Sequence, residues 1–170
     1  MYLTDVIGND YQTWRQGEWI FLKSPPGSGK TTFCNQYARK MVREGKSVLM
    51  LSPRRVLVNQ QKSQAMQNIA KQADGYFQEI DGIYYSSYQR LEQSLLNGFN
   101  TLGSFDIVIC DEAHYFLCDA VFNPYTQISL EAILKHRKAM LIFLCGTVED
   151  FEKYIFSKFD CRLEEKRNGD

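Results

Sequence analysis

Residues 24–31, Ser-Pro-Pro-Gly-Ser-Gly-Lys-Thr, have the residue types and spacing of a loop that binds phosphate groups. They fit the pattern G-x-x-x-x-G-K-[ST], known as Walker A, except that serine replaces the first glycine. In such a loop backbone N–H groups surround the phosphates, and the positive end of the following helix attracts them. We expect Lys30 to reach the β- and γ-phosphates of ATP and the Thr31 hydroxyl to bind Mg²⁺. The phosphate-binding residues would be Gly27, Ser28, Gly29, Lys30, Thr31 and Thr32.

Two consecutive prolines, Pro25 and Pro26, lie inside this loop although proline has no N–H group to donate. The donors that the loop needs come from Gly27 to Thr32, after the prolines. The fixed φ angles of the prolines would therefore stiffen the entry to the loop without removing a required donor. The alternative, a glycine-rich turn that binds nothing, is disfavoured because a strand is predicted before the loop and a helix after it.

The acidic pair Asp111-Glu112 directly follows an apolar, β-branched segment at 105–110. A carboxylate at the end of a buried strand is the Walker B arrangement. Asp111 would hold Mg²⁺ through water, and Glu112 would polarise the water that attacks the nucleotide. The alternative interpretation is a solvated acidic turn without a function. The presence of the phosphate loop upstream disfavours this alternative. The two motifs together predict nucleotide hydrolysis.

Apolar strands separated by helical segments indicate how these residues are positioned. Strands are predicted at 18–23, 46–52, 82–86, 105–110 and 139–145, and helices at 31–44, 54–73, 129–137 and 148–159, with another that begins after an N-cap at Ser86 or Ser87. This alternation predicts an α/β fold, a three-layer αβα domain with a mainly parallel central sheet. Ligands bind beyond the carboxyl ends of such strands. We therefore expect the loop, the acidic pair and residues 145–147 to converge.

Composition places the chain among ordinary globular proteins. It has 170 residues and a formal net charge of zero. The chain therefore lacks the overall positive charge that would point to a dedicated nucleic-acid-binding domain. The five cysteines have no C-x-x-C spacing, which favours small buried thiols over disulfides or a zinc site. No signal peptide and no apolar run long enough to span a bilayer is present, so we expect a cytoplasmic location and no membrane partner.

At residues 111–114, Asp-Glu-Ala-His, the sequence resembles the first RecA-like domain of superfamily 2 helicases, in the DEAH form of motif II. Residues 24–31 resemble motif I. Three weaker matches follow in the expected order: Pro53-Arg54-Arg55 for motif Ia, residues 84–91 near motif Ib, and residues 144–147 for motif III. The resemblance covers about residues 17–150 and implies a RecA-like P-loop NTPase fold.

The resemblance also implies which residues would contact nucleic acid, DNA or RNA. Pro53, Arg54 and Arg55 would approach the phosphate backbone, a contact for which arginine is well suited. Ser87 and Tyr88 would touch the same strand. For these two residues helix capping and core packing remain an equal alternative.

Coupling between hydrolysis and strand movement would depend on His114 and on motif III, by the same resemblance. His114 would link the ATP site to Thr147, although it could instead be a satisfied structural histidine. Cys145 stands where motif III usually has its first hydroxyl, and a thiol is a poorer hydrogen-bonding group.

Recognition of adenine could use a glutamine upstream of the phosphate loop. Gln12 and Gln16 are candidates, with Tyr11 or Trp14 for stacking. The alternative is that the aromatic residues near the N-terminus, including Trp19, pack against the domain.

We expect residues 1–160 to form one ATP-binding domain and residues 161–170 to be a domain edge or the start of a linker. A superfamily 2 helicase also needs a second RecA-like domain, which supplies an arginine finger and which we expect to be absent from this chain. Because such a finger contributes roughly 10³–10⁵ in rate, the chain alone should bind Mg·ATP, hydrolyse it slowly and not unwind nucleic acid.

The function that these motifs favour is the ATP-binding domain of a nucleic-acid helicase or translocase. One alternative is another P-loop ATPase motor, such as a packaging or remodelling ATPase; the DEAH segment and residues 52–55 favour the helicase. The other alternative is a non-catalytic, ATP-dependent binding module. The intact Lys30, Thr31, Asp111 and Glu112 disfavour it.

Overall fold

The computed structural model describes residues 10–23, 29–53, 77–98, 102–116, 126–136, 138–146, 150–151 and 153. The strands are β1 (Trp19–Lys23), β2 (Val48–Ser52), β3 (Gln78–Ile80), β4 (Ile83–Ser87), β5 (Ile107–Cys110) and β6 (Met140–Cys145). The helices are α2 (Lys30–Arg43), α5 (Tyr88–Leu96) and α7 (Thr126–Lys135), with the short 3-10 helices η1 (Asp10–Thr13) and η2 (Leu102–Ser104). For the predicted elements that fall on described residues, these bounds lie within a few residues of the predicted ones. The helix predicted at 54–73 and most of the one predicted at 148–159 lie outside the described residues.

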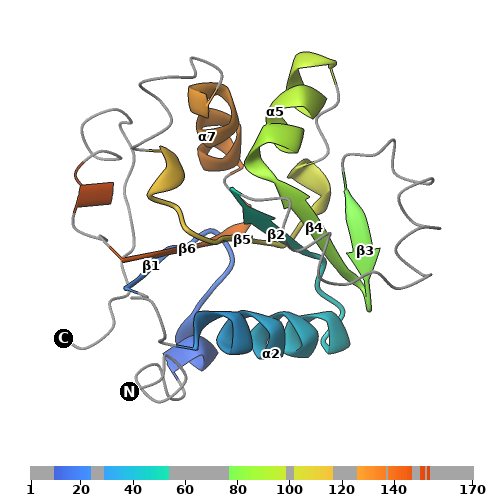
Figure 1. The fold of residues 1–170 in the computed structure, drawn as a ribbon. Coiled ribbons are helices and arrows are strands. Elements are labelled where there is room, and N and C mark those ends of the chain that lie inside the picture. Colours follow the sequence, from blue (N-terminus) through green and yellow to red (C-terminus); the bar gives the residue numbers. More distant parts are fainter. Residues whose placement is uncertain are drawn as a thin grey trace.

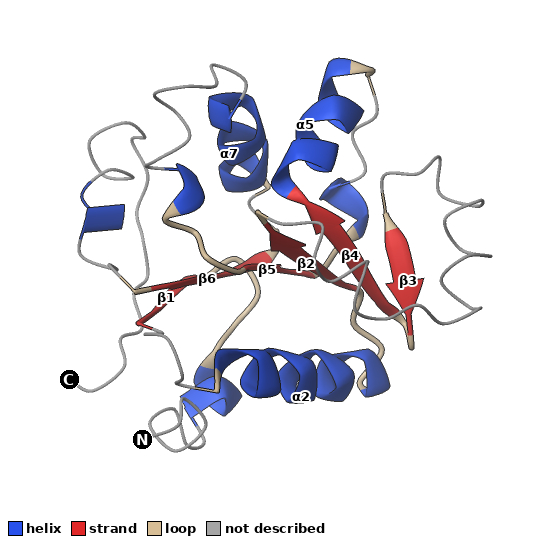
Figure 2. Ribbon diagram, viewed as in Figure 1, coloured by secondary structure: helices blue, strands red, loops and turns tan. Residues whose placement is uncertain are grey.

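The strands form one sheet in the order β1-β6-β5-β2-β4-β3. Every neighbouring pair is parallel except β3 and β4, which are antiparallel. Helix α2 covers one face of the sheet, and α5 and α7 cover the other (Figures 1 and 2). The predicted three-layer α/β architecture with a mainly parallel sheet is therefore confirmed.

Alternate residues of each central strand contribute to two separate cores, which is why the strands are apolar throughout. Phe21, Leu49 and Val108 belong to the cluster that includes residues of α5 and α7. The residues between them on the strands belong to the cluster that includes Phe33 and Tyr37 of α2. All six residues of β6 are buried, so this strand is held from both faces.

Strand β3, which the sequence analysis did not predict, forms a hairpin with β4. Asp81 (φ 53°) and Gly82 (φ 82°) join the two strands in left-handed conformations, as a two-residue hairpin turn requires. A Cβ at Gly82 would lie 2.7 Å from Cγ1 of Val42 at the end of α2. The close approach adds a second reason for glycine at this position.

Polar side chains tie the amino ends of three strands together. The Asp106 carboxylate, just before β5, accepts hydrogen bonds from the Ser47 N–H (2.9 Å) and hydroxyl (3.1 Å), just before β2. The Gln16 amide donates to the carbonyls of Asp106 (2.8 Å) and Lys138 (3.1 Å). We call Gln16, Ser47 and Asp106 the amino-end network. Since it lies at the opposite end of the strands from the phosphate loop, Gln16 is not placed to read a base bound at that loop.

The aromatic residues near the N-terminus pack on α2. Trp14 lies 5.4 Å from Tyr37 and 6.0 Å from Phe33 between ring centroids, and Tyr11 lies 6.0 Å from Tyr37. This is the packing alternative to adenine stacking. Among the described residues, no helix has the length and apolar character needed to cross a membrane.

Candidate active site

Two segments far apart in the sequence meet at the carboxyl ends of β1 and β5. Strand β6 lies between β1 and β5 in the sheet, so the end of β1 that leads into the phosphate loop is one strand away from the acidic pair. Helix α2 begins at Lys30, and its N-cap Gly29 adopts a left-handed conformation (φ 76°). Glycine has no side chain to bond the first N–H groups of the helix, which suits a site where an anion is to bind them.

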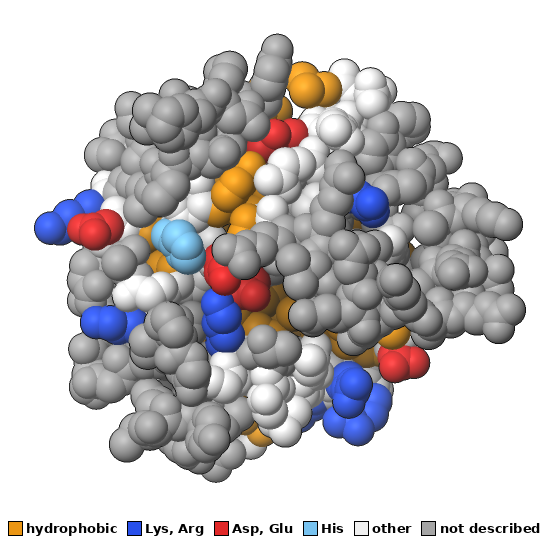
Figure 3. All heavy atoms as spheres, in the orientation of Figure 1, with side chains coloured by type: hydrophobic (Ala, Val, Ile, Leu, Met, Phe, Trp, Pro, Cys, Tyr) orange, Lys and Arg blue, Asp and Glu red, His pale blue; other side chains and the backbone are white. Residues whose placement is uncertain are grey.

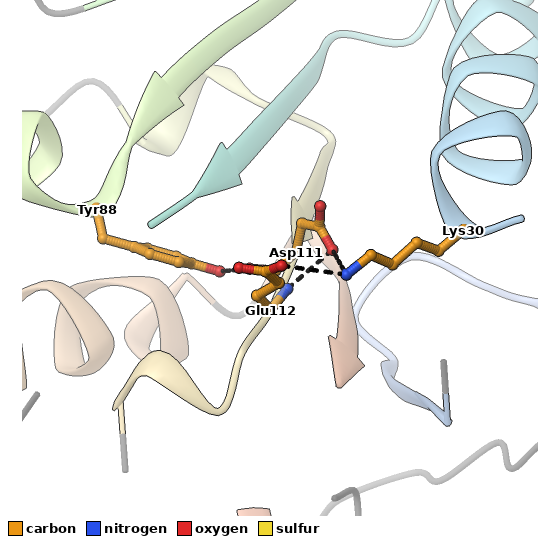
Figure 4. Close-up of polar contacts among 4 residues, drawn as sticks. All are labelled: Lys30, Tyr88, Asp111 and Glu112. Carbon is orange, nitrogen blue, oxygen red and sulfur yellow. Dashed lines mark hydrogen bonds and ion pairs between the residues drawn. The ribbon is translucent and has the colours of Figure 1, made fainter. Parts of the chain in front are cut away.

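Lys30 lies between the two carboxylates of the predicted site (Figure 4). Its Nζ atom is 3.4 Å from Oε1 of Glu112 and 3.5 Å from Oδ1 of Asp111. The side chain of Lys30 is 25% exposed, that of Glu112 32% and that of Asp111 24%. The sequence prediction that these residues converge agrees with this geometry. On the face shown in Figure 3, acidic and basic side chains adjoin near the middle.

The electrostatics of the site favour a cation beside the carboxylates. Burial raises the pKa of Asp111, and Glu112 raises it further, while Lys30 acts in the opposite direction. Two carboxylates and one ammonium leave an excess of negative charge, which a divalent cation would neutralise. Among the described residues no group of three or more His, Cys, Asp or Glu side chains is arranged to hold a metal ion, so the donors here would be the two carboxylates. This donor set fits Mg²⁺, which typically uses one or two carboxylates, water and phosphate oxygens.

Main-chain hydrogen bonds fix the turn formed by residues 111–114. The Asp111 N–H donates to the carbonyl of Leu51 on β2 (2.8 Å), and the Ala113 N–H donates to the carbonyl of Leu144 on β6 (2.9 Å). Between these anchors Glu112 has a left-handed backbone, φ 49°, which is uncommon for a residue with a side chain. The turn is therefore held by both neighbouring strands while Glu112 is in an unusual conformation.

Tyr88, for which the sequence left nucleic-acid contact and core packing as equal alternatives, contacts the acidic turn. Its hydroxyl donates a 2.7 Å hydrogen bond to the Asp111 carbonyl (Figure 4), and its side chain is fully buried. Ser87 is also buried, and its hydroxyl accepts a hydrogen bond from the Arg90 N–H (3.1 Å) as the N-cap of α5. Capping and core packing, the alternative to nucleic-acid contact, describe both residues in this structure. No sequence signal pointed to the contact between Tyr88 and Asp111.

The other predicted residues are described in part. Pro53 follows β2 and is partly exposed, Thr32 is exposed on α2, and His114 is partly exposed in the turn after β5. Thr31 lies in the first turn of α2. The remaining predicted residues lie outside the described part of the chain: Gly27, Ser28, Arg54, Arg55 and Thr147.

The cysteines near the site are structural. Cys34, Cys110 and Cys145 are buried and form no disulfide, in agreement with the sequence prediction for these three. Burial raises the pKa of the Cys34 and Cys110 thiols far above the ordinary value. Neutral buried thiols are poor nucleophiles, so these two are not suited to covalent chemistry.

The fold resembles known helicase structures. The helicase domain of Hef from Pyrococcus furiosus matches all of this chain and 40% of its own, with a TM-score of 0.56 and 18% identity. A hypothetical ATP-dependent RNA helicase from Sulfolobus tokodaii matches 97% of this chain and 51% of its own, with a TM-score of 0.61 and 22% identity. The chain thus spans about half the length of these proteins.

No match was found among curated proteins. A family model, described as type III restriction enzyme, res subunit, matches residues 5–150. This range includes the phosphate loop, the DEAH turn and every strand of the described sheet. The chain therefore belongs to the family of the type III restriction enzyme res subunit, and it has the fold of the N-terminal RecA-like domain of superfamily 2 helicases.

Proposed function

We propose that this chain is the ATP-binding domain of a DEAH-type superfamily 2 helicase or translocase, which hydrolyses Mg·ATP and couples hydrolysis to movement along nucleic acid. The observation that carries the proposal is the contact of Lys30 with both Asp111 and Glu112, within 3.5 Å, at the carboxyl ends of the strands. A lysine at a helix start and a carboxylate pair after a buried strand are the groups that phosphoryl transfer needs. The family match supports the same proposal.

Each residue of the cluster has a separate role in this proposal. The N–H groups at the start of α2 and the Lys30 ammonium bind the phosphates and offset their negative charge. Asp111 and Thr31 would hold Mg²⁺, which would help to neutralise the charge of the phosphates. Glu112 accepts a hydrogen bond from the attacking water and takes its proton. When Lys30 turns to the phosphates, Glu112 loses its ion pair and becomes free for this role.

The partners follow from the same comparison. Pro53, Arg54 and Arg55 would contact the nucleic-acid backbone, and His114 with Thr147 would transmit the state of the ATP site to that contact. A second RecA-like domain would complete the ATP site. The relatives are named as a helicase domain and an RNA helicase, so DNA and RNA both need testing. The chain alone would bind Mg·ATP and turn it over slowly; a rate above about 1 s⁻¹ would contradict this part of the proposal.

The test compares ATP hydrolysis by the whole protein, as it is encoded, with and without single-stranded DNA, duplex DNA and RNA. We expect at least one nucleic acid to stimulate hydrolysis. If none of them changes the rate, the helicase proposal is wrong and another ATPase motor becomes the better explanation. If the protein neither binds nor hydrolyses ATP, all ATPase proposals fail.

Glu112→Gln separates catalysis from nucleotide binding. The variant keeps the size and shape of the side chain but removes the base. Hydrolysis should therefore fall roughly 10²–10⁴-fold while ATP still binds. The matched control is Glu44→Gln, the same change at an exposed residue beyond the end of α2, which should leave both properties unchanged. Undiminished hydrolysis in Glu112→Gln would show that another group activates the water.

A further inference from the structure

We propose that Tyr88 is a positioning residue for hydrolysis, because its hydroxyl sets the direction of Glu112. This inference rests on the proposed ATPase function and adds a residue from a different element, the first position of α5. The Tyr88 side chain is fully buried, and its hydroxyl is hydrogen-bonded to the main chain of Asp111. It acts through the main chain of the acidic pair.

The geometry of one peptide group carries the inference. The Asp111 carbonyl and the Glu112 N–H belong to the same planar peptide. Its carbonyl accepts the Tyr88 hydroxyl at 2.7 Å, and its N–H donates to Oδ1 of Asp111 at 2.9 Å. Because the plane is held at both ends, its rotation is fixed. That rotation determines φ of Glu112, which is 49°.

The Tyr88 ring is itself held rigidly. It stacks on Tyr115, with ring centroids 5.1 Å apart and planes 10° apart, and meets Phe116 edge-on at 4.6 Å. A rigidly packed phenol is suited to hold one peptide plane against the tendency of Glu112 to leave the left-handed region.

Tyr88 is also connected to the sheet independently of the turn that it holds. It follows Ser87, the last residue of β4, and β4 pairs with β2. The Asp111 N–H is bonded to Leu51 on β2. Tyr88 is therefore anchored through β4, and Asp111 through β2, the strand next to β4. As a result the position of Glu112 is fixed relative to the middle of the sheet.

The experiment removes only the hydroxyl, with Tyr88→Phe in the whole protein. The phenylalanine ring keeps the stacked contact with Tyr115 and the edge-on contact with Phe116, so the variant should fold. We expect kcat to fall between roughly tenfold and hundredfold, since a small displacement of a catalytic group has an effect of this size. The Kd of a fluorescent ATP analogue should change less than about twofold, because Lys30 and the start of α2 are untouched.

The matched control is Tyr37→Phe. Tyr37 is also buried, and its hydroxyl lies 3.2 Å from the sulfur of Met140, a weak acceptor. This variant loses a buried phenol without touching the acidic turn. Its kcat should remain within about twofold of the unmodified protein. Thermal unfolding of both variants confirms that rates are compared between folded proteins.

A double variant distinguishes an effect of the Tyr88 hydroxyl on Glu112 from a general effect of packing on the hydrolysis rate. If the hydroxyl acts through Glu112, adding Tyr88→Phe to Glu112→Gln should leave the residual rate unchanged within about twofold. Additive losses, or an unchanged kcat in Tyr88→Phe, would overturn the inference while leaving the ATPase proposal intact. Absence of hydrolysis by the unmodified protein would overturn both.

Discussion

Two aspartates flank strand β5, and they differ in almost every respect. Asp106, at the amino end of the strand, accepts hydrogen bonds from the N–H and the hydroxyl of Ser47, and these bonds lower its pKa. Asp111, at the carboxyl end, is more deeply placed, and burial raises its pKa. The hydrogen bonds from Ser47 outweigh the effect of burial at Asp106. Asp111 also has the Glu112 N–H and Lys30 beside it, but burial outweighs them, and a bound cation would relieve this unfavourable effect.

The contrast extends to the backbone around each residue. In the amino-end network the starts of the strands are joined by hydrogen bonds between side chains and the main chain, including those of Gln16. At the carboxyl end Glu112 has a left-handed backbone conformation, and Lys30 is paired with two carboxylates. In the proposed function this sheet therefore has two tasks: its amino end stabilises the fold, and its carboxyl end keeps charge and backbone strain available for a ligand.

Among the variants that test this comparison, Asp111→Asn should have the largest effect. Because the carboxylate holds Mg²⁺ in the proposed mechanism, hydrolysis should fall roughly 10²–10³-fold. The free energy of unfolding at pH 7 should stay the same or increase, since a carboxylate with a raised pKa is replaced by a neutral group. Steady-state rates and denaturant unfolding measure the two effects. A less active and clearly less stable variant would mean that Asp111 serves the fold, as Asp106 does.

Asp106→Ala should show the opposite pattern. Loss of two hydrogen bonds to a partly exposed carboxylate should lower the free energy of unfolding by about 1–2 kcal/mol and Tm by about 5 °C. The kcat should remain near that of the unmodified protein, because the residue lies at the far end of the strand. Thermal unfolding and an ATPase assay check the pair of expectations. An equal stability in the two proteins would remove the structural role that we assign to Asp106.

The pH dependence of the two variants sharpens the same comparison. The folded pKa of Asp106 lies below its unfolded value, so its stabilising effect is complete above that value and is lost as pH falls through the folded pKa. Asp111 has a raised folded pKa, so its destabilising effect is present above that pKa and disappears as pH falls through it. On acidification the stability difference between Asp111→Asn and the unmodified protein should therefore vanish first. The reverse order, in urea unfolding at a series of pH values, would contradict the assignment.

The smallest effect should come from Gln16→Ala. Its side chain is exposed, so loss of two hydrogen bonds to the starts of β5 and β6 should cost about 0.5–1 kcal/mol. The Kd for ATP should not change, because Gln16 lies at the end of the sheet away from the phosphate loop. Titration with a fluorescent nucleotide tests this directly. A weaker Kd would revive Gln16 as an adenine-reading residue.

Much of the fold and the charged cluster was predictable because the signals are local. Each buried strand is a continuous apolar segment, and Lys30, Asp111 and Glu112 belong to motifs whose order and spacing imply the same end of a parallel sheet. The turn after β3 also has a local signal, Asp81-Gly82, although β3 itself, at three residues, was too short to be predicted.

The connections between these elements were not predictable in the same way. The hydroxyl of Tyr88 and the Asp111 carbonyl are 23 residues apart, Ser47 and Asp106 are 59 apart, and the Gln16 contacts span 90 and 122 residues. Such contacts depend on strand order and register, which residue patterns do not specify. For this reason the sequence offered nucleic-acid contact and core packing as equal alternatives for Tyr88 and gave no sign of its hydrogen bond to the Asp111 carbonyl.

The position of β6 between β1 and β5 has a consequence for how the protein is made. On a ribosome the chain emerges from its N-terminus, so β1 and β5 are available before β6, and neither can complete its pairing until residues 140–145 have left the exit tunnel. Until then β1 has no hydrogen-bonded neighbour among the described strands, and such unpaired edges favour aggregation. If ATP binds as proposed, it could not assist this early stage, because β6 lies between the strands that lead to Lys30 and to the acidic pair. Chaperone capture of nascent chains should therefore end once β6 has inserted.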